Sequence, residues 1–337
     1  MSVRIRSASL AGYRETAEVA GLDPVRMLRE FHLPRRCLWE PEVRVPIEAV
    51  RRLLERSAER SGLESFGLMM AEARRMSDLG PLGLLVREQP TVRLALEACA
   101  QYANQLNEAL HLTLEQDGDV VVLREELLFG SLGSVRQSTE LAIGVIFRTL
   151  RHFLSDEWRP RRVCFAHAAP PDRRVHNRVF GVRVEFGHAF NGIVCARADL
   201  DRSNPRADPG IARLARRLLE SDTTPHPADM TAHVRHLVVR LLGSGRCSID
   251  AAADHLGVDR RTVQRRLRKE GQTFSAVMRG VKKELASRYL EDPQRRLTDI
   301  AELLGFSTLS VFSRWHRREF GRSARQGRAE VTRARGR

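Results

Sequence analysis

The stretch that decides the fold of the C-terminal region runs from Ala253 to Leu267 and reads ADHLGVDRRTVQRRL. Ser248, shortly before it, is a residue type that caps helices, and the helix it begins is expected to end at Leu256. A glycine then allows a tight turn. Asp259 can accept hydrogen bonds from the free N–H groups of a second helix, expected from Arg260 to about Glu270. The stretch therefore predicts a helix-turn-helix unit.

The same pattern returns later in the chain. A helix is expected over Leu297–Leu304, a turn over Gly305–Ser307 and a second helix over Thr308–Phe320. A long helix, from about Ser275 to Leu290, lies between the two patterns. One pattern is weak evidence, because many helical hairpins have a glycine at the corner. Two patterns joined by a long helix are stronger evidence, because each can hold one helix rigidly away from its support.

The second helix of the first unit has two chemically different faces. Val263 and Leu267 are four residues apart, as in a buried stripe. The opposite face carries Arg261, Gln264, Arg265 and Arg268. Arginine can hydrogen-bond the O6 and N7 atoms of guanine, and glutamine the N6 and N7 atoms of adenine, so this face suits the major groove of DNA. Arg260 and Arg266 lie at the flanks and are better placed for phosphates.

The corresponding helix of the second unit is less polar. Its exposed candidates are Leu309, Ser310, Ser313, Arg314, Arg317 and Arg318. Because few of these side chains can read base edges, we expect this helix to make fewer base contacts and more contacts with the DNA backbone.

The positive charge is concentrated in the same region. The chain has 57 Lys and Arg against 42 Asp and Glu, a net charge of +15. Residues 228–337 contain 24 basic and 12 acidic residues, a net charge of +12, whereas residues 1–227 contribute only +3. A bias of the genome toward arginine would not concentrate the charge in this way. The distribution therefore favours a nucleic-acid partner over a merely solvated basic surface.

The preceding region mixes helical and strand patterns. Apolar residues at three- and four-residue spacing predict helices over 47–58, 91–106 and 138–153. Alternation on either side of Asp117-Gly118 predicts a hairpin within 110–123. Short strands are expected over 163–165 and 182–186. The predicted fold class is an α+β N-terminal domain followed by an all-α domain with two helix-turn-helix units joined by a long helix.

The expected domain boundaries follow from clusters of helix-breaking residues between Asp201 and Pro227. These clusters surround one short helix, 211–219, that we expect to bridge the domains or to help in dimerisation. The expected parts are an effector-binding and dimerisation domain, a linker with that helix, a DNA-binding domain and a basic tail, over residues 1–205, 206–227, 228–328 and 329–337.

Composition excludes several other classes of protein. No uncharged run exceeds the 11 residues of Phe186–Ala196 or Leu303–Ser313, far short of the roughly 20 that a membrane helix needs. The first residues form no apolar leader, and five scattered cysteines are typical of reduced thiols. We therefore expect a cytoplasmic protein without a membrane partner.

Residues 228–328 resemble the DNA-binding domain of the AraC/XylS family of transcriptional regulators. The resemblance is carried by Ala253–Leu267, by Ile300–Ser307 and by Phe312-Ser313-Arg314. It implies that two recognition helices enter successive major grooves of DNA. By the resemblance, the base-reading positions are Arg261, Gln264, Arg265, Ser310, Ser313 and Arg314. The chain departs from the family pattern at three positions, which leaves the packing of the last turn open: His316 and Gly327 replace aromatic residues, and Ala324 replaces a proline.

The first domain resembles the N-terminal domain of the ornithine-utilisation-regulator branch of this family. The motifs, in order, are Ala20–Pro24, Phe66-Gly67-Leu68, Leu79–Gly83, Trp158-Arg159-Pro160 with Val163, Phe165 and His167, then Phe180-Gly181-Val182 and Phe186-Gly187. The resemblance implies effector binding and dimerisation but names no ligand.

Other chemical signals are weaker. His233 and His236 are three residues apart on a predicted helix but lack further ligands, so we expect a solvated face and no metal. Cys164 and His167 lack an orienting acid, so we expect packing rather than nucleophilic catalysis. We find no phosphate-binding loop and no dinucleotide motif, and we expect neither a cofactor nor an enzyme.

The expected function is therefore sequence-specific regulation of transcription, with promoter DNA and a small-molecule effector as partners. RNA polymerase and a second copy of the chain are further expected partners. Activation of transcription is the expected outcome, although the residues leave repression open. The alternatives are a nonspecific architectural nucleic-acid-binding protein without an effector, and a DNA-modifying enzyme that uses this unit for delivery.

Overall fold

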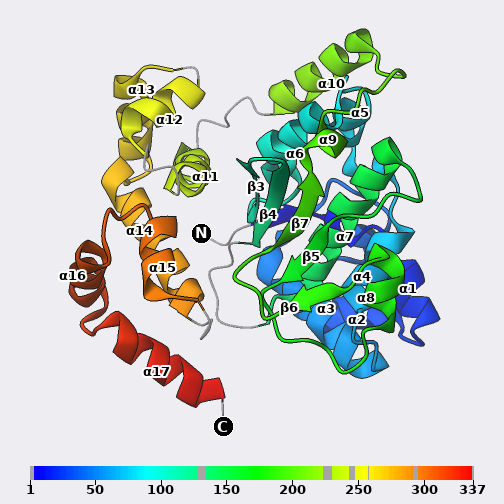
Figure 1. Cartoon of the computed structure of the whole chain (residues 1–337), viewed down its shortest axis with the longest axis horizontal. Helices are drawn as coiled ribbons and strands as arrows, with labels where there is room; N and C mark the ends of the chain where they lie inside the picture. The colour runs from blue at the N-terminus through cyan, green and yellow to red at the C-terminus, as the bar shows by residue number, and fades with distance from the viewer. Residues whose placement is uncertain are drawn as a thin grey trace. The chain divides into compact units, whose positions relative to one another are not determined.

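The computed structural model describes residues 4–127, 134–222, 230–242, 247–256, 258–290 and 295–335. The chain separates into two compact units, Met1–Asp222 and Thr223–Arg337 (Figure 1). The turn residue Gly257 and residues 223–229 of the predicted linker lie outside the described residues. None of the described helices is both long and apolar enough to cross a membrane.

The N-terminal unit is built on a five-stranded sheet. Its strand order is β3 (Leu110–Asp117), β4 (Val120–Leu127), β7 (Asn191–Ala196), β5 (Arg162–Phe165) and β6 (Val184–Phe186). Neighbouring strands are antiparallel except β5 and β6, which are parallel. The predicted hairpin is confirmed as β3–β4, with Gly118 in the left-handed conformation at its turn. Strands β1 (Arg4–Arg6) and β2 (Arg44–Pro46) form a separate small sheet.

Helices cover one face of the five-stranded sheet (Figure 1). The core contains Leu123, Val163 and Ile193 from the sheet, packed against apolar residues of the helices. The helices of this unit are α1 (Tyr13–Val19), α2 (Pro24–Glu30), α3 (Ile47–Ser61), α4 (Phe66–Ala73), α5 (Pro81–Arg87), α6 (Val92–Leu106), α7 (Arg136–Leu154), α8 (Arg174–Phe180), α9 (Arg197–Leu200) and α10 (Pro209–Asp222). The three predicted helices are confirmed as α3, α6 and α7, and the α+β class is confirmed with them.

Helices α4 and α7 approach each other closely because two glycines lie at their contact. A Cβ on Gly67 would overlap the backbone carbonyl of Gln137, and a Cβ on Gly144 would lie 2.6 Å from the Cβ of Ala71. The Gln137 side chain also accepts a hydrogen bond from the Gly67 N–H at 2.7 Å. The two helices therefore pack closely: backbone meets backbone at Gly67, and Gly144 leaves room for the side chains of Ala71 and Leu68.

Helix α10, the helix expected within the linker, is part of the N-terminal unit. It packs against α5 and buries Ala215 and Leu219 in the core of that unit. The residue before the helix is held by the Glu88 carboxylate, which accepts a hydrogen bond from the Asp208 N–H at 2.9 Å. The outer face of the helix exposes three large apolar residues, Ile211, Leu214 and Leu218.

The described residues of the C-terminal unit are helical. The helices are α11 (Met230–Leu242), α12 (Ile249–His255), α13 (Arg260–Lys269), α14 (Phe274–Leu290), α15 (Leu297–Leu303), α16 (Leu309–Phe320) and α17 (Ala324–Arg335). Helix α11 packs against α12, α13 and α14, and α14 packs against α15 and α17. The predicted all-α domain, with two helix-turn-helix units joined by a long helix, is confirmed. The expected start of the tail, residue 329, falls within α17.

Candidate DNA interface and ligand cavity

Helix α13 is anchored by its cap and by two core residues. The Asp259 carboxylate accepts hydrogen bonds from the Thr262 N–H and hydroxyl, each at 2.8 Å. These hydrogen bonds lower the pKa of Asp259, because they stabilise the charged carboxylate. Val263 and Leu267 are completely buried, as the sequence predicts. The orientation of α13 is therefore fixed from its first turn onward.

The opposite face of α13 is open to solvent. Arg260, Arg261, Arg265 and Arg268 are exposed, and Gln264 is half-buried. Arg260 lies 3.5 Å from the Asp250 carboxylate. Among the described residues, no carboxylate forms an ion pair with Arg261, Arg265 or Arg268. The face thus presents cationic hydrogen-bond donors that the unit itself does not neutralise.

Helix α16 also has an N-terminal cap, a buried inner face and an exposed outer face, but its outer face carries fewer arginines. The Thr308 hydroxyl accepts a hydrogen bond from the Val311 N–H at 3.3 Å and caps the helix. Phe312 is completely buried on the inner face. The predicted contact residues are exposed on the other side of the helix: Ser310, Ser313, Arg314 and Arg317.

The turn of the second unit requires glycine. Gly305 has φ +68°, and a Cβ at this position would lie 2.5 Å from the carbonyl oxygen of Leu242, at the end of α11. The ring of Phe306, next along the chain, packs against Trp315 with centroids 5.1 Å apart. Lys282 of the long helix lies over the same Phe306 ring at 4.1 Å. The corner is therefore held against both α11 and α14.

The three departures from the family pattern lie on α16 and α17, which pack against each other. His316 is buried and stacks on Phe320, with centroids 4.4 Å apart and planes 19° apart. Its Nδ1 lies 3.0 Å from the carbonyl oxygen of Arg322, so the neutral ring donates there. Ala324 and Gly327 are buried, and a Cβ on Gly327 would lie 3.6 Å from the His316 ring. Small residues on α17 thus face the histidine that replaces an aromatic residue.

The N-terminal unit contains an apolar cavity of about 110 Å³ between α3, α6, α7 and the β3–β4 hairpin. Leu54, Leu112, Leu141 and Ile146 are among its lining residues. Sequence reasoning did not identify any of these as ligand-binding residues, because they come from segments far apart in the chain. The signal that could have been used is on α7, where cavity residues recur at three- and four-residue spacing as Ser138, Leu141, Val145 and Thr149.

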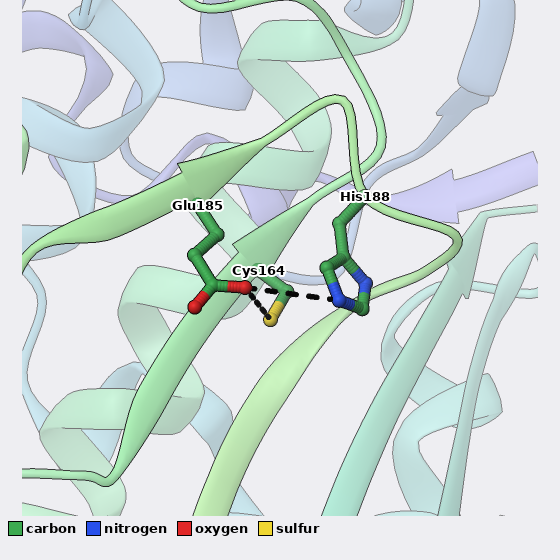
Figure 2. A group of neighbouring side chains, drawn as sticks. All are labelled: Cys164, Glu185 and His188. Atoms are coloured by element: carbon green, nitrogen blue, oxygen red, sulfur yellow. Dashed lines mark hydrogen bonds and ion pairs between the residues drawn. The ribbon is translucent and has the colours of Figure 1, made fainter. Parts of the chain in front are cut away.

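A cysteine, a glutamate and a histidine come together on the other face of the sheet (Figure 2). One carboxylate oxygen of Glu185 lies 3.9 Å from the thiol of Cys164 and 3.7 Å from Nε2 of His188. The same oxygen lies 3.9 Å from Arg162. Burial raises the pKa of Cys164 to about 11 and lowers the pKa of His188. Because Arg162 lies near the same carboxylate oxygen, we assign no metal to this cluster.

The sequence analysis also considered His167, His233 and His236 as candidate catalytic or metal-binding residues. Nδ1 of His167 lies 2.9 Å from the Ala168 carbonyl oxygen, and its Nε2 lies 3.5 Å from the buried Glu140 carboxylate. Burial lowers the pKa of His167. His233 is half-buried on α11, and the side chain of His236 lies outside the described residues.

Comparisons with known proteins agree with this architecture. Residues 21–204 match the family model described as the arabinose-binding domain of AraC transcription regulator, N-terminal, and residues 252–330 match a helix-turn-helix domain. The chain is 32% identical over 331 residues to the HTH-type transcriptional regulator VirS of Mycobacterium tuberculosis, covering 96% of each chain. It is 26% identical over 265 residues to the ornithine utilization regulator of Pseudomonas aeruginosa, covering 77% of each.

A solved structure also matches over most of its length. The transcriptional regulator CdpR from Pseudomonas aeruginosa is 23% identical, with a TM-score of 0.44, covering 90% of this chain and 96% of that one. A sheet-containing effector domain followed in the chain by two helix-turn-helix units defines a two-domain DNA-binding regulator. The chain belongs to the AraC family of transcriptional regulators.

Proposed function

We propose that this regulator reads promoter DNA with the exposed faces of α13 and α16. The observation that carries the proposal is the unneutralised face of α13, which a buried stripe and a cap hold in a fixed orientation. The proposed base-reading residues of α13 are Arg261, Gln264 and Arg265, and Arg268 lies on the same face. Arg260 and Arg266, at the flanks, would contact phosphates. On α16 the proposed contact residues are Ser310, Ser313, Arg314 and Arg317.

The two helices would enter successive major grooves, about 34 Å apart along the duplex. Because the exposed face of α13 is more polar than that of α16, we propose different roles for the two helices. Helix α13 would supply most of the discrimination between sequences, because its face is richer in side chains that pair with base edges. Helix α16 would mainly fix the position of the unit on the DNA backbone.

We further propose that a small molecule bound in the apolar cavity of the N-terminal unit controls this binding by shifting the population of a DNA-competent arrangement. A second copy of the chain would associate through this unit, and the exposed stripe of Ile211, Leu214 and Leu218 on α10 supports that. We place the protein in the cytoplasm, where it would act on transcription with RNA polymerase, and we assign it no catalytic role.

The test uses a duplex selected from a random pool by the full chain, together with a scrambled duplex of the same composition. Arg265→Ala should weaken binding to the selected duplex by about 1–3 kcal/mol and leave binding to the scrambled duplex much less changed. Arg29→Ala removes an exposed arginine from the N-terminal unit and is the matched control for loss of charge. Equal loss on both duplexes would reduce Arg265 to a phosphate contact.

The same measurement separates the alternative function. A nonspecific architectural protein would bind the selected and scrambled duplexes equally, with an affinity that falls steeply as salt rises. In that case no duplex would be enriched from the random pool.

A further inference from the structure

A second, smaller cavity adjoins the apolar cavity. The second cavity has a volume of about 90 Å³ and lies beside the C-terminal half of α7. The two cavities share four wall residues: Arg74, Leu79, Val145 and Thr149. We call the second one the basic cavity, because its wall also contains Arg75, Arg148 and His152. A molecule that filled both would pass from apolar surroundings to cationic ones.

The lining of the basic cavity contains cationic residues and no acidic ones. Among the described residues, no carboxylate forms an ion pair with Arg74, Arg75 or Arg148. Arg51, on the wall of the apolar cavity, is different, because its guanidinium is paired with Glu48. Of these two arginines, Arg51 is ion-paired and Arg74, which both cavities share, is not.

Arg74 is held rigidly at the junction. Its Nε donates to the Ala11 carbonyl at 3.2 Å, and its Nη2 donates to the carbonyls of Ala8 and Ser9. Burial lowers the pKa of Arg74 to about 10, and nearby Asp78, on the apolar cavity wall, raises it. The guanidinium is therefore charged at neutral pH. The carbonyls of Ala8, Ser9 and Ala11 orient the guanidinium, and Asp78 stabilises its charge without forming an ion pair with it.

We propose that the ligand of the N-terminal unit is an amphipathic acid. Its apolar acyl or aryl group would occupy the apolar cavity, and its carboxylate or phosphate would lie in the basic cavity against Arg74 and Arg148. A neutral sugar fits less well, because most residues around the apolar cavity are apolar and only a few, such as Ser9, Asn107 and Ser138, could hydrogen-bond its many hydroxyl groups. The role of this acid as an effector rests on the proposed function.

The direct test measures the thermal shift and the Kd of the full chain with four probes: decanoate, decyl phosphate, decanol and arabinose. We expect decanoate or decyl phosphate to bind at least tenfold more tightly than decanol, and arabinose not to bind. Comparison of the two acids shows which head group is preferred. Equal affinity for decanoate, decyl phosphate and decanol, or binding of arabinose alone, would overturn the inference.

Two variants assign the binding to these cavities. Arg148 is exposed and has no ion-pair partner among the described residues, so Arg148→Gln should fold normally. It should weaken binding of the preferred acid at least tenfold and leave decanol unchanged. Ala142→Leu, which adds volume to the apolar cavity wall, should weaken both acid and decanol. Arg29→Gln is the matched control; an effect as large as that of Arg148→Gln would overturn the assignment.

Binding of the selected duplex, measured with and without the preferred acid, separates this inference from the proposed function. Acid binding that Arg148→Gln weakens supports the ligand inference even if duplex affinity does not respond, in which case the effector role alone fails. Specific duplex binding by a protein that binds none of the acids overturns the ligand inference and leaves the reading of DNA intact.

Discussion

The carboxylate of Asp259 accepts two hydrogen bonds from Thr262, one from its backbone N–H and one from its hydroxyl, both at 2.8 Å. This pair begins the helix that carries the proposed base-reading residues. Because the first N–H groups of a helix have no partner within the helix, the side chain of Asp259 supplies one. The cap therefore contributes to stability and to the direction in which Arg261 and Arg265 project.

Removal of this cap should destabilise the C-terminal unit. Asp259→Ala is expected to lower its free energy of unfolding by about 1 kcal/mol. Trp315 packs within the aromatic cluster of α16, so its fluorescence, in a Trp39→Phe, Trp158→Phe background, reports the unfolding of this unit alone. Asp254→Ala is the control, because it removes an exposed carboxylate of α12 that caps no helix. Equal effects of the two variants would show that charge, and not capping, decides the result.

Two glycines of the C-terminal unit allow a test of close packing at the second turn. Gly271 and Gly305 have nearly the same φ, +69° and +68°, but a Cβ on Gly271 would meet no atom within 4 Å. Gly271→Ala should therefore lower the free energy of unfolding only by the strain of placing alanine in the left-handed conformation, about 1–2 kcal/mol. Gly305→Ala should cost that amount and about 1–3 kcal/mol more, because its Cβ would press on the Leu242 carbonyl. Urea unfolding followed by Trp315 measures both, and similar costs would contradict the tight contact.

His316 should make the stability of the C-terminal unit sensitive to acid. Burial lowers the pKa of this histidine below its ordinary value of 6.5, so the unfolded chain takes up the proton first as the pH falls. The stabilisation is present above pH 6.5 and is lost as the pH falls toward the lower pKa of the folded state. In His316→Phe, stability measured with Trp315 should depend less on pH between 7 and 5. An unchanged pH dependence would exclude His316 as the source.

The sequence predicted the C-terminal unit better than the sheet of the N-terminal unit. Helix caps and turn glycines are local signals, and Asp259, Thr308 and Gly305 marked the units without tertiary information. Strand β7, the middle strand of the sheet, was missed because Gly192, Ile193, Val194 and Cys195 are all buried, so no alternation of apolar and polar residues marks it.

The assignment of α10 to a linker had a related cause. Its amphipathic pattern was visible, but the pattern does not say against which element Ala215 and Leu219 pack, and that element, α5, lies more than 100 residues earlier in the chain. The two cavities were beyond sequence reasoning for the same reason. Arg74 and Arg148 lie side by side only after α4 and α7 have packed. The DNA-contacting residues stay a prediction, although all but the half-buried Gln264 are exposed.

The contact between α4 and α7 limits how the N-terminal unit can deform. Because Gly67 packs against the Gln137 backbone and Gly144 against the Ala71 Cβ, the two helices have little room to shift against each other. The two helices must therefore move as one rigid body. Since α7 forms a wall of both cavities, any widening that displaced it would carry α4 along, and with α4 the helices packed on it, α1, α3 and α8. A local strain would thus become a concerted shift of five helices.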